Sequence, residues 1–267
     1  MNSIQLTDAE FQKISGLVME LSGIYLSESK KALVSGRLAK RLREFGLDSY
    51  NAYFDLLMEP GGQRELQHAL DLLTTNETYF FREPDHFDYL RENLISQLPS
   101  HDSFRVWSAA CSSGEEAYTL AMVLADSLGS RVWEIIASDL SSRMLDKART
   151  GIYPESRKKH FPPFFFERFC QPVVKNPNEF EIDRKLKRRV HFMPINLISS
   201  YPDIGPFDLI FLRNVMIYFD LETKRNVVRK ILGMLKKGGH FIIGHSENLH
   251  GIDEGLMSIK PSIFRKI

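Results

Sequence analysis

One stretch of this chain, Phe104–Glu116, restricts the possible folds more than any other part of the sequence. It reads FRVWSAACSSGEE, an apolar strand followed by small residues and the start of a helix. One βα unit later a second apolar strand, Trp133–Ser138, ends at Asp139. In doubly wound α/β folds this pattern places backbone N–H groups and a helix N-terminus opposite a carboxylate, around a nucleoside. The pattern favours such a pocket, and an ordinary strand-to-helix turn is the alternative.

The loop between strand and helix indicates which kind of nucleoside fits. It lacks the G-x-G-x-x-G pattern, and Glu115 and Glu116 stand where a pyrophosphate would lie. Acids at this position repel phosphates, so a cationic or neutral nucleoside is favoured. S-adenosylmethionine, a sulfonium that carries an amino-acid group, is the expected cofactor. Asp139 is expected to accept its ribose hydroxyls, and a helix N-cap is the other interpretation of this residue.

Composition narrows the class of protein. The 267 residues are 43% hydrophobic and 26% charged, as in ordinary globular proteins, and the length allows one large or two modest domains. A net charge of +1 gives no global attraction to nucleic acid. The two cysteines have no metal-ligand spacing, so we expect no metal. The sequence has no secretory leader and no membrane-spanning run, which predicts a cytoplasmic protein without direct membrane insertion.

The pattern of apolar residues changes once along the chain. Residues 1–74 show helical spacing throughout, including a capping box at Thr7 and Glu10, and predict an all-helical domain. Residues 75–267 alternate between strands and helices, which predicts a doubly wound parallel sheet. The expected strands are Arg105–Ala109, Trp133–Ser138, Asp208–Leu212 and His240–Ile243, followed by an antiparallel pair at Leu256–Ile259 and Ser262–Ile267.

The alternation is interrupted by turn-rich sequence, which predicts a small β subdomain inserted at about residues 170–193. Pro172–Lys175 and Glu179–Asp183 are expected to pair across an Asn-Pro-Asn turn, followed by a strand at Lys187–Phe192. From composition alone, a partner-binding insertion and a plain surface loop are both open.

The chain resembles the CheR family of chemoreceptor glutamate methyltransferases over nearly its whole length. The motifs that carry the resemblance are TTNETYFFRE at Thr74–Glu83, VWSAACSSGEEAY at Val106–Tyr118, ASD at Ala137–Asp139, PINL at Pro194–Leu197, FDLIFLRNVMIYF at Phe207–Phe219 and GHSEN at Gly244–Asn248. The resemblance implies a class I, Rossmann-like methyltransferase fold with a helical N-terminal domain. It also implies methyl transfer from S-adenosylmethionine to receptor glutamates during chemotaxis signalling.

The resemblance also implies a set of cofactor-binding residues. Glu116 corresponds to the family's acid for the ammonium group, although a first-turn acid that favours the helix dipole is the other interpretation. Arg82 could bind the cofactor's carboxylate or the incoming glutamate, or form an interdomain salt bridge. The cofactor-binding positions carried over are Asn76, Thr78, Arg82, Glu116, Asp139, Asn196, Leu197, Arg213 and Asn214.

The implied catalytic residues are few because the nucleophile is a carboxylate that is already ionised at neutral pH. No general base is required, so His245 is expected to make a structural hydrogen bond. Arg82 and Tyr218 are the expected catalytic residues, with Tyr218 orienting the carboxylate. A plain core tyrosine is the alternative for Tyr218.

Receptor recognition is expected from the helix that ends near Phe45. It carries a basic stripe beside an apolar one, which indicates either a solvated face or, by resemblance, a surface for acidic receptor helices. Family members that tether to a receptor's C-terminal pentapeptide have a glycine-bearing loop in the β subdomain, which Lys175–Glu179 lacks. We therefore expect a pentapeptide-independent, monomeric enzyme. The receptor-binding residues are predicted to be Lys30, Arg37, Lys40 and Arg41.

Three other functions remain open from the sequence. An amine or nucleic-acid methyltransferase is disfavoured because Arg213–Met216 replaces the Asn/Asp-Pro-Pro-aromatic motif of base methylation. A non-catalytic S-adenosylmethionine sensor would share the binding residues. A methyltransferase of a signalling array outside chemotaxis would differ only in its substrate.

Overall fold

The computed structural model describes residues 4–99, 103–252 and 255–267. Its contacts divide the chain into two compact units. The helical unit comprises Met1–Thr75 and Tyr218–Thr223, and the sheet unit comprises Asn76–Ile217 and Lys224–Ile267. Each unit has its own hydrophobic core.

Amphipathic helices build the helical unit. The first begins with the predicted capping box: the Glu10 N–H donates to the Thr7 hydroxyl, and the Glu10 carboxylate accepts from the Thr7 N–H. Of the four residues of the apolar stripe expected on the second helix, Val34, Leu38 and Leu42 are fully buried, whereas Phe45, at the end of the helix, is exposed. The elements are α1 (Asp8–Ser22), the short turn η1 (Glu28–Lys30), α2 (Lys31–Glu44), α3 (Tyr50–Met58) and α4 (Gln63–Leu73).

A seven-stranded sheet forms the centre of the sheet unit, with strand order β6-β2-β1-β7-β8-β10-β9. The first five strands are parallel, and β10 is antiparallel to both neighbours. This confirms the predicted α/β class and the closing antiparallel pair. The strands are β1 (Phe104–Ala109), β2 (Trp133–Asp139), β6 (Val190–Pro194), β7 (Phe207–Leu212), β8 (Leu235–Ile243), β9 (Leu256–Lys260) and β10 (Ile263–Lys266).

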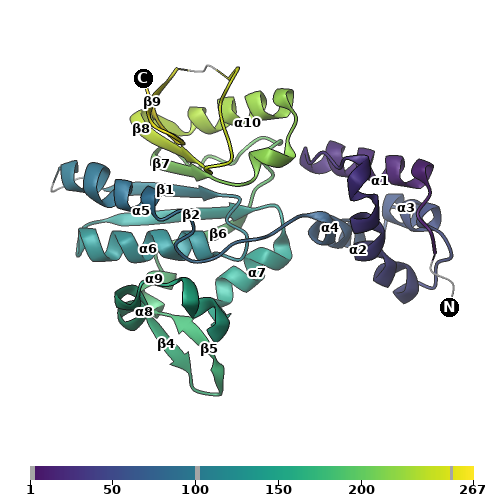
Figure 1. The fold of residues 1–267 in the computed structure, drawn as a ribbon, viewed down its shortest axis with the longest axis horizontal. Coiled ribbons are helices and arrows are strands. Elements are labelled where there is room, and N and C mark those ends of the chain that lie inside the picture. The colour runs from purple at the N-terminus through teal and green to yellow at the C-terminus, as the bar shows by residue number, and fades with distance from the viewer. Residues whose placement is uncertain (1–3, 100–102, 253–254) are drawn as a thin grey trace. The chain divides into compact units, whose positions relative to one another are not determined.

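Helices cover both faces of this sheet (Figure 1). Helix α6 leads from β1 to β2, and α10 leads from β7 to β8 in the opposite direction along the sheet. Right-handed crossovers therefore place these two helices on opposite faces. The helices are α5 (Asp85–Tyr89), α6 (Glu115–Leu128), α7 (Ser142–Thr150), α8 (Pro163–Phe169), α9 (Arg184–Lys187) and α10 (Leu221–Gly233), with short turns η2 (Leu90–Leu94), η3 (Ile95–Gln97), η4 (Glu155–His160) and η5 (Met216–Tyr218).

The strand order also locates the expected ligand crevice. From β1 the chain runs outward through β2 to β6, then returns to β7 on the other side of β1. Doubly wound sheets bind ligands at such a switch point, outside the carboxyl ends of the strands. The residues at or just beyond these ends are Ala110 after β1, Asp139 on β2, Asn196 after β6 and Arg213 after β7.

A separate three-stranded sheet, with order β3-β5-β4, lies where the β subdomain is predicted. It begins earlier than expected, because β3 (Ile152–Pro154) pairs with β5 (Asn176–Ile182). The other edge strand is β4 (Cys170–Val173), and the hairpin turns at Val174-Lys175 rather than at the Asn-Pro-Asn sequence. The strand expected at Lys187–Phe192 forms instead as β6, in the main sheet beside β2. A three-residue strand such as β3 is too short for its alternation to be recognised in the sequence.

Aromatic packing joins this small sheet to the segment that follows the helical unit. Phe80 is fully buried, with its ring centroid 4.3 Å from that of Phe161 and 4.9 Å from that of Tyr153. Phe81 is also buried and packs 4.9 Å from Phe165. The two phenylalanines are therefore core anchors, and they fix the backbone on which Thr78 and Arg82 stand.

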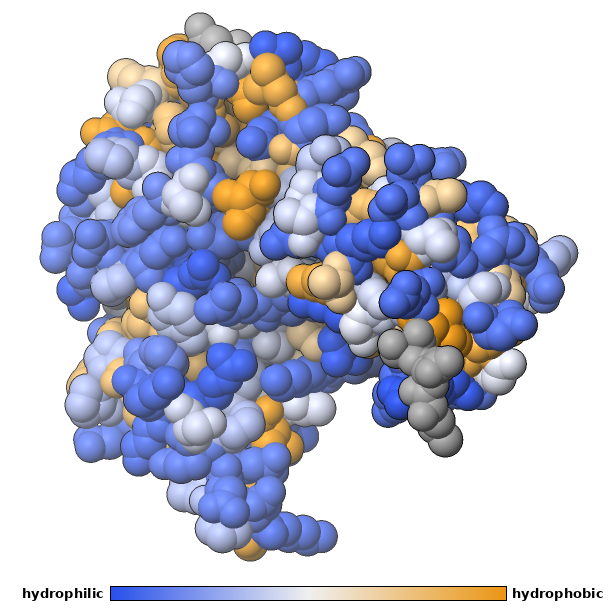
Figure 2. Space-filling model, turned by 45° about the vertical axis from the view of Figure 1, so that its right-hand side comes forward, coloured by the Kyte–Doolittle hydropathy of each residue, from blue (hydrophilic) through white to orange (hydrophobic). Residues whose placement is uncertain are grey.

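The surface is that of an ordinary globular chain on the face drawn in Figure 2, where hydrophobic side chains stand in small groups among hydrophilic ones. Within the described ranges, no helix combines the length and the apolar character needed to cross a bilayer.

Candidate active site

The loop between β1 and α6 has a strained backbone. Ala110, Ser112 and Gly114 have positive φ angles of 60°, 49° and 92°. Such conformations cost non-glycine residues roughly 1–3 kcal/mol each and cluster at functional sites. A Cβ atom on Gly114 would lie 2.8 Å from the Cβ of Ala148, so the close approach of α7 also requires glycine here.

Asp139 lies against this loop at the carboxyl end of β2. Its Oδ2 accepts the Ser112 N–H at 2.8 Å, and its Oδ1 accepts the Ser141 N–H at 2.9 Å. Ser141, not Asp139, is the N-cap of α7, because its hydroxyl accepts the Met144 N–H. These two bonds fix the Asp139 carboxylate at the carboxyl end of β2, where the ribose acceptor is predicted.

The segment Asn76–Glu83 runs beside the same loop. The Ser112 hydroxyl donates to the Asn76 carbonyl at 3.1 Å, and the Phe81 N–H donates to the Thr119 hydroxyl of α6 at 3.1 Å. The Thr78 carbonyl accepts Arg157 Nη1 at 2.6 Å, which ties the segment to η4. These bonds bring the first sequence motif to the carboxyl edge of the sheet, although its residues lie far from that edge in sequence.

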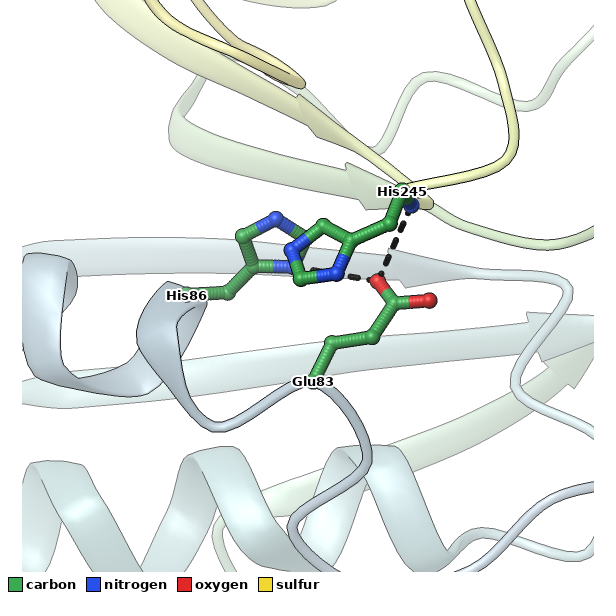
Figure 3. A group of neighbouring side chains, drawn as sticks. All are labelled: Glu83, His86 and His245. Atoms are coloured by element: carbon green, nitrogen blue, oxygen red, sulfur yellow. Dashed lines mark hydrogen bonds and ion pairs between the residues drawn. The ribbon is translucent and has the colours of Figure 1, made fainter.

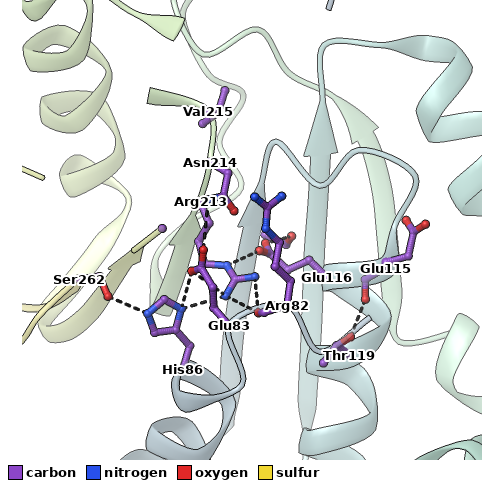
Figure 4. A network of polar contacts seen from close by, with 12 residues as sticks. Arg82, Glu83, His86, Glu115, Glu116, Thr119, Arg213, Asn214, Val215 and Ser262 are labelled. Atoms are coloured by element: carbon purple, nitrogen blue, oxygen red, sulfur yellow. Dashed lines mark hydrogen bonds and ion pairs between the residues drawn. The ribbon is translucent and has the colours of Figure 1, made fainter. Parts of the chain in front are cut away.

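Arg82 and Arg213, both predicted site residues, differ in exposure. The Arg82 guanidinium is partly exposed, donates to the Glu77 carbonyl at 2.9 Å and lies over the Tyr79 ring. The Arg213 side chain is 2% exposed, and its Nε lies 2.8 Å from Glu116 Oε2. The other oxygen of Glu116, Oε1, accepts the Ser108 hydroxyl at 2.7 Å. Figure 4 shows Arg213 between Glu116 and the main chain of Arg82. Arg82 can therefore reach a ligand directly, whereas the Arg213 side chain is committed to protein groups.

Asn214 follows in a left-handed conformation, with φ of 57°. The loop is held by Glu247, a residue to which the sequence interpretation assigned no role. Its carboxylate accepts four backbone N–H groups, from Asn214, Val215, Met216 and Gly244, at 2.7–3.0 Å. Burial raises the pKa of Glu247, and the four amide donors oppose that shift. A Cβ on Gly244 would lie 2.5 Å from the Asn214 Nδ2, so glycine is needed beside this loop.

Asn196 and Leu197 follow β6, the neighbour of β2. The Ile195 N–H donates to the Asp139 carbonyl at 3.2 Å, which places this turn next to the predicted ribose site. The Asn196 Oδ1 accepts the Ile198 N–H, and the Leu197 side chain is buried. Tyr218, by contrast, groups with the helical unit, where its carbonyl accepts the Tyr25 N–H at 2.8 Å.

Glu115 and Cys111 are both more buried than their positions on the loop suggest. Glu115, in the first turn of α6, has no exposed surface; it accepts the Ser113 hydroxyl at 2.6 Å, and its burial raises its pKa. The Cys111 side chain is 1% exposed, and burial raises the pKa of its thiol. A buried thiol of raised pKa is a poor nucleophile, so Cys111 acts as a small space-filling residue in this loop.

Glu83, His86 and His245 place three potential metal-ligand atoms within 4.8 Å of one another (Figure 3). However, His86 Nδ1 lies 2.9 Å from Arg213 Nη1, and the same Nη1 lies 3.5 Å from the Glu83 carboxylate. A guanidinium group, which always carries a positive charge, therefore occupies the position that faces these ligands. The cluster is better described as an arginine site than as a cation site.

The predicted receptor-binding stripe on α2 divides into two kinds of residue. Arg41 binds Glu65 through two nitrogens at 2.7 and 2.5 Å and also contacts Glu44. Arg37 donates to the Leu73 and Thr74 carbonyls at the end of α4. Lys40 is 77% exposed and lies 3.6 Å from Glu44, and Lys30 is exposed. The arginines therefore stabilise the helical unit, and the two lysines remain accessible.

Comparison with known proteins gives the family of this chain. Residues 76–263 match the family described as "CheR methyltransferase, SAM binding domain", and residues 9–74 match "CheR methyltransferase, all-alpha domain". The chain belongs to the CheR methyltransferase family. It is 40% identical to the chemotaxis protein methyltransferase of Escherichia coli, over 94% of this chain and 88% of that protein. It is 37% identical to that of Borreliella burgdorferi, over 99% of this chain and 96% of that protein.

The CheR assignment agrees with the geometry. The boundary between the two matched domains falls where the two units meet in sequence. The sheet unit is an S-adenosylmethionine-binding methyltransferase domain, and its residues suit that cofactor. The Asp139 carboxylate is held at the end of β2, and the Glu116 carboxylate, in the first turn of α6, accepts the Ser108 hydroxyl of β1.

Proposed function

We propose that this protein transfers the methyl group of S-adenosylmethionine to side-chain carboxylates of specific glutamates on the cytoplasmic helices of chemoreceptors. The glutamate methyl esters would serve sensory adaptation. The observation that carries the proposal is that the Asn76–Glu83 segment, Asp139 and Arg213-Asn214 converge on one edge of the sheet in a CheR-family chain. The relatives are named chemotaxis protein methyltransferases, and this supports a receptor substrate.

Each cofactor group has a proposed binding residue. Asp139 would accept the ribose hydroxyls, and Glu116 would pair with the ammonium group. Asn196 and Leu197 would contact the adenine, and Asn214 the amino-acid part. The cofactor's carboxylate would lie near Asn76, Thr78 and Arg82. When bound, S-adenosylmethionine supplies an electrophilic methyl group on a cationic sulfur.

The residues around the acceptor glutamate need only orient it and exclude water. A glutamate side chain is ionised at neutral pH, so no proton must be removed before it attacks. His86 could not act as a base, because burial lowers its pKa to about 3 and both its ring nitrogens have partners. The partly exposed Arg82 can offer two parallel N–H donors to a carboxylate. The Tyr218 hydroxyl is proposed to orient the same group.

We propose that the accessible lysines of α2, Lys30 and Lys40, contact the receptor, and that no pentapeptide tether is needed. The β4–β5 hairpin turns at Val174-Lys175 without a glycine, and the Val174 side chain is fully exposed. We expect a pentapeptide of the tethering type to give no heat of binding in isothermal titration calorimetry. Binding at low micromolar concentration would contradict this part of the proposal.

The test is to locate the methyl group. The protein is incubated with S-adenosylmethionine and a chemoreceptor cytoplasmic fragment, and the peptides are analysed by mass spectrometry. We expect one added methylene on particular glutamates, and its loss when those residues are replaced by alanine. A methyl group on lysine or on no residue, across several cognate fragments, would contradict the proposal. In that case an amine methyltransferase or a non-catalytic sensor would be favoured.

A further inference from the structure

The guanidinium of Arg213 joins three parts of the site. Its Nε donates to Glu116 Oε2 at 2.8 Å, and its Nη1 and Nη2 donate to the Arg82 carbonyl at 2.9 and 2.8 Å. Its central carbon lies 5.4 Å from the ring centroids of both Phe87 and Phe211. This side chain thus sets the position of the Glu116 carboxylate relative to the segment that carries Arg82 (Figure 4).

His86 is a further partner of Arg213. An arginine N–H can only donate, so His86 Nδ1, at 2.9 Å from Arg213 Nη1, must be an unprotonated acceptor. The proton therefore resides on Nε2, which donates to the Ser262 hydroxyl at 2.8 Å. That hydroxyl donates onward to the Pro261 carbonyl, in the turn between β9 and β10. The imidazole is held at both ends and is 1% exposed.

Glu83 is a more distant partner that competes with His86 for Arg213. The Glu83 carboxylate lies 3.5 Å from Arg213 Nη1, and it also accepts the Asn214 Nδ2 and the His245 N–H. Loss of the neutral acceptor would leave a buried N–H unpaired, and it would favour rotation of the guanidinium towards Glu83. Such a rotation would move Nε away from Glu116.

We propose that His86 is a positioning residue: through Nδ1 it fixes the Arg213 guanidinium, which holds the Glu116 carboxylate in place for the cofactor's ammonium group. The inference rests on the proposed placement of that ammonium group at Glu116. His86 touches neither cofactor nor substrate in this account. Its effect should therefore fall on ligands that carry the amino-acid group and not on ligands that lack it.

Two ligands separate this effect from general damage. S-adenosylhomocysteine carries the ammonium group, and 5′-methylthioadenosine has the same nucleoside without it. Their dissociation constants are measured by calorimetry for the parent, His86→Phe, His86→Asn and Arg213→Lys. His86→Phe removes the acceptor, whereas His86→Asn keeps an oxygen close to the position of Nδ1. His240→Phe is the matched control, a partly buried histidine on β8 whose ring lies near that of Tyr89.

We expect His86→Phe and Arg213→Lys to weaken S-adenosylhomocysteine about tenfold or more, a change of about 1.4 kcal/mol. Binding of 5′-methylthioadenosine should change less than about twofold, and His86→Asn should recover most of the lost affinity. His240→Phe should change neither constant. Equal weakening of both ligands by His86→Phe, or no change in either, would overturn the inference. Failure of the parent to bind S-adenosylhomocysteine would instead refute the cofactor placement itself, and the positioning role with it.

Discussion

Replacement of Asp139 by alanine should remove most of the affinity for the cofactor. A carboxylate that accepts two ribose hydroxyls makes two charged hydrogen bonds, each of about 1.5–3 kcal/mol. The loss of both corresponds to about 3–6 kcal/mol, or at least a hundredfold in the dissociation constant. The same variant leaves the N–H groups of Ser112 and Ser141 without their acceptor. The loop that faces the cofactor would then also lose its support.

The assay is titration of S-adenosylhomocysteine by calorimetry, with urea unfolding of each variant measured without ligand. Asp208→Ala is the matched control, because Asp208 also accepts a backbone N–H, from Arg105 at 2.8 Å, and pairs with Lys236. It lies near the start of β7, at the amino ends of the parallel strands, whereas Asp139 lies at their carboxyl ends. Both variants should lose stability, and only Asp139→Ala should lose affinity.

The reasoning would be refuted if Asp139→Ala bound S-adenosylhomocysteine as tightly as the parent. It would also be refuted if Asp208→Ala lost as much affinity as Asp139→Ala. The first result would place the ribose elsewhere. The second would show that the affinity follows the overall stability of the sheet and not the carboxylate at the end of β2.

Three further predictions follow from individual contacts. In the parent, backbone N–H groups share the Glu247 carboxylate, and Glu247→Gln places an amide donor against them. The free energy of unfolding in urea should therefore fall by about 3 kcal/mol. An unchanged midpoint would contradict this anchoring role. Lys30→Glu with Lys40→Glu should slow receptor methylation and reduce its dependence on salt, with a loss of stability of only about 0.5 kcal/mol from the Lys40–Glu44 pair. Arg41→Ala should destabilise the helical unit more, because it breaks the contact with Glu65. Equal methylation rates for the double variant and the parent would show that this side of α2 is only a solvated face. Burial, with Arg213 and His245 nearby, lowers the pKa of His86 from 6.5 to about 3, so between these values only the unfolded chain takes up the proton and stability falls as the pH drops. Between pH 7 and pH 5 His86 should lower the free energy of unfolding by about 2 kcal/mol. Measured by urea unfolding at the two pH values, His86→Asn should therefore lose about 2 kcal/mol less stability than the parent. Equal losses of stability in the two proteins would contradict this prediction.

The regular elements could be predicted from local sequence. The capping box at Thr7 and the apolar strands Phe104–Ala109 and Trp133–Asp139 depend on spacing within a few residues, and the structure contains all three. The small sheet was harder to predict from local sequence. Its first strand, Ile152–Pro154, has three residues and pairs with a strand that lies more than twenty residues later. Long-range pairing of this kind leaves no periodic signal in the chain.

The residues of the candidate site also divide into those that local sequence reveals and those that depend on distant contacts. Asp139 and Glu116 could be identified because each directly follows or opens a recognisable element. The role of Glu247 could not, although its motif was recognised, because its partners Asn214–Met216 lie about thirty residues away. Arg213 was marked as a site residue, but its burial between Phe87 and Phe211 depends on how α5 packs on β7. Contacts between distant segments decide whether a charged side chain meets a ligand or holds another residue.

The central claim is tested most directly by the chemistry of the transferred group. S-adenosylmethionine with a radiolabelled methyl group is incubated with the protein and a chemoreceptor cytoplasmic fragment, and the labelled fragment is then treated with mild alkali. The account predicts that the label appears on the fragment and is released as volatile methanol, because carboxyl methyl esters hydrolyse under these conditions. Label that stays on the fragment after alkali, as on a methylated amine, would contradict it.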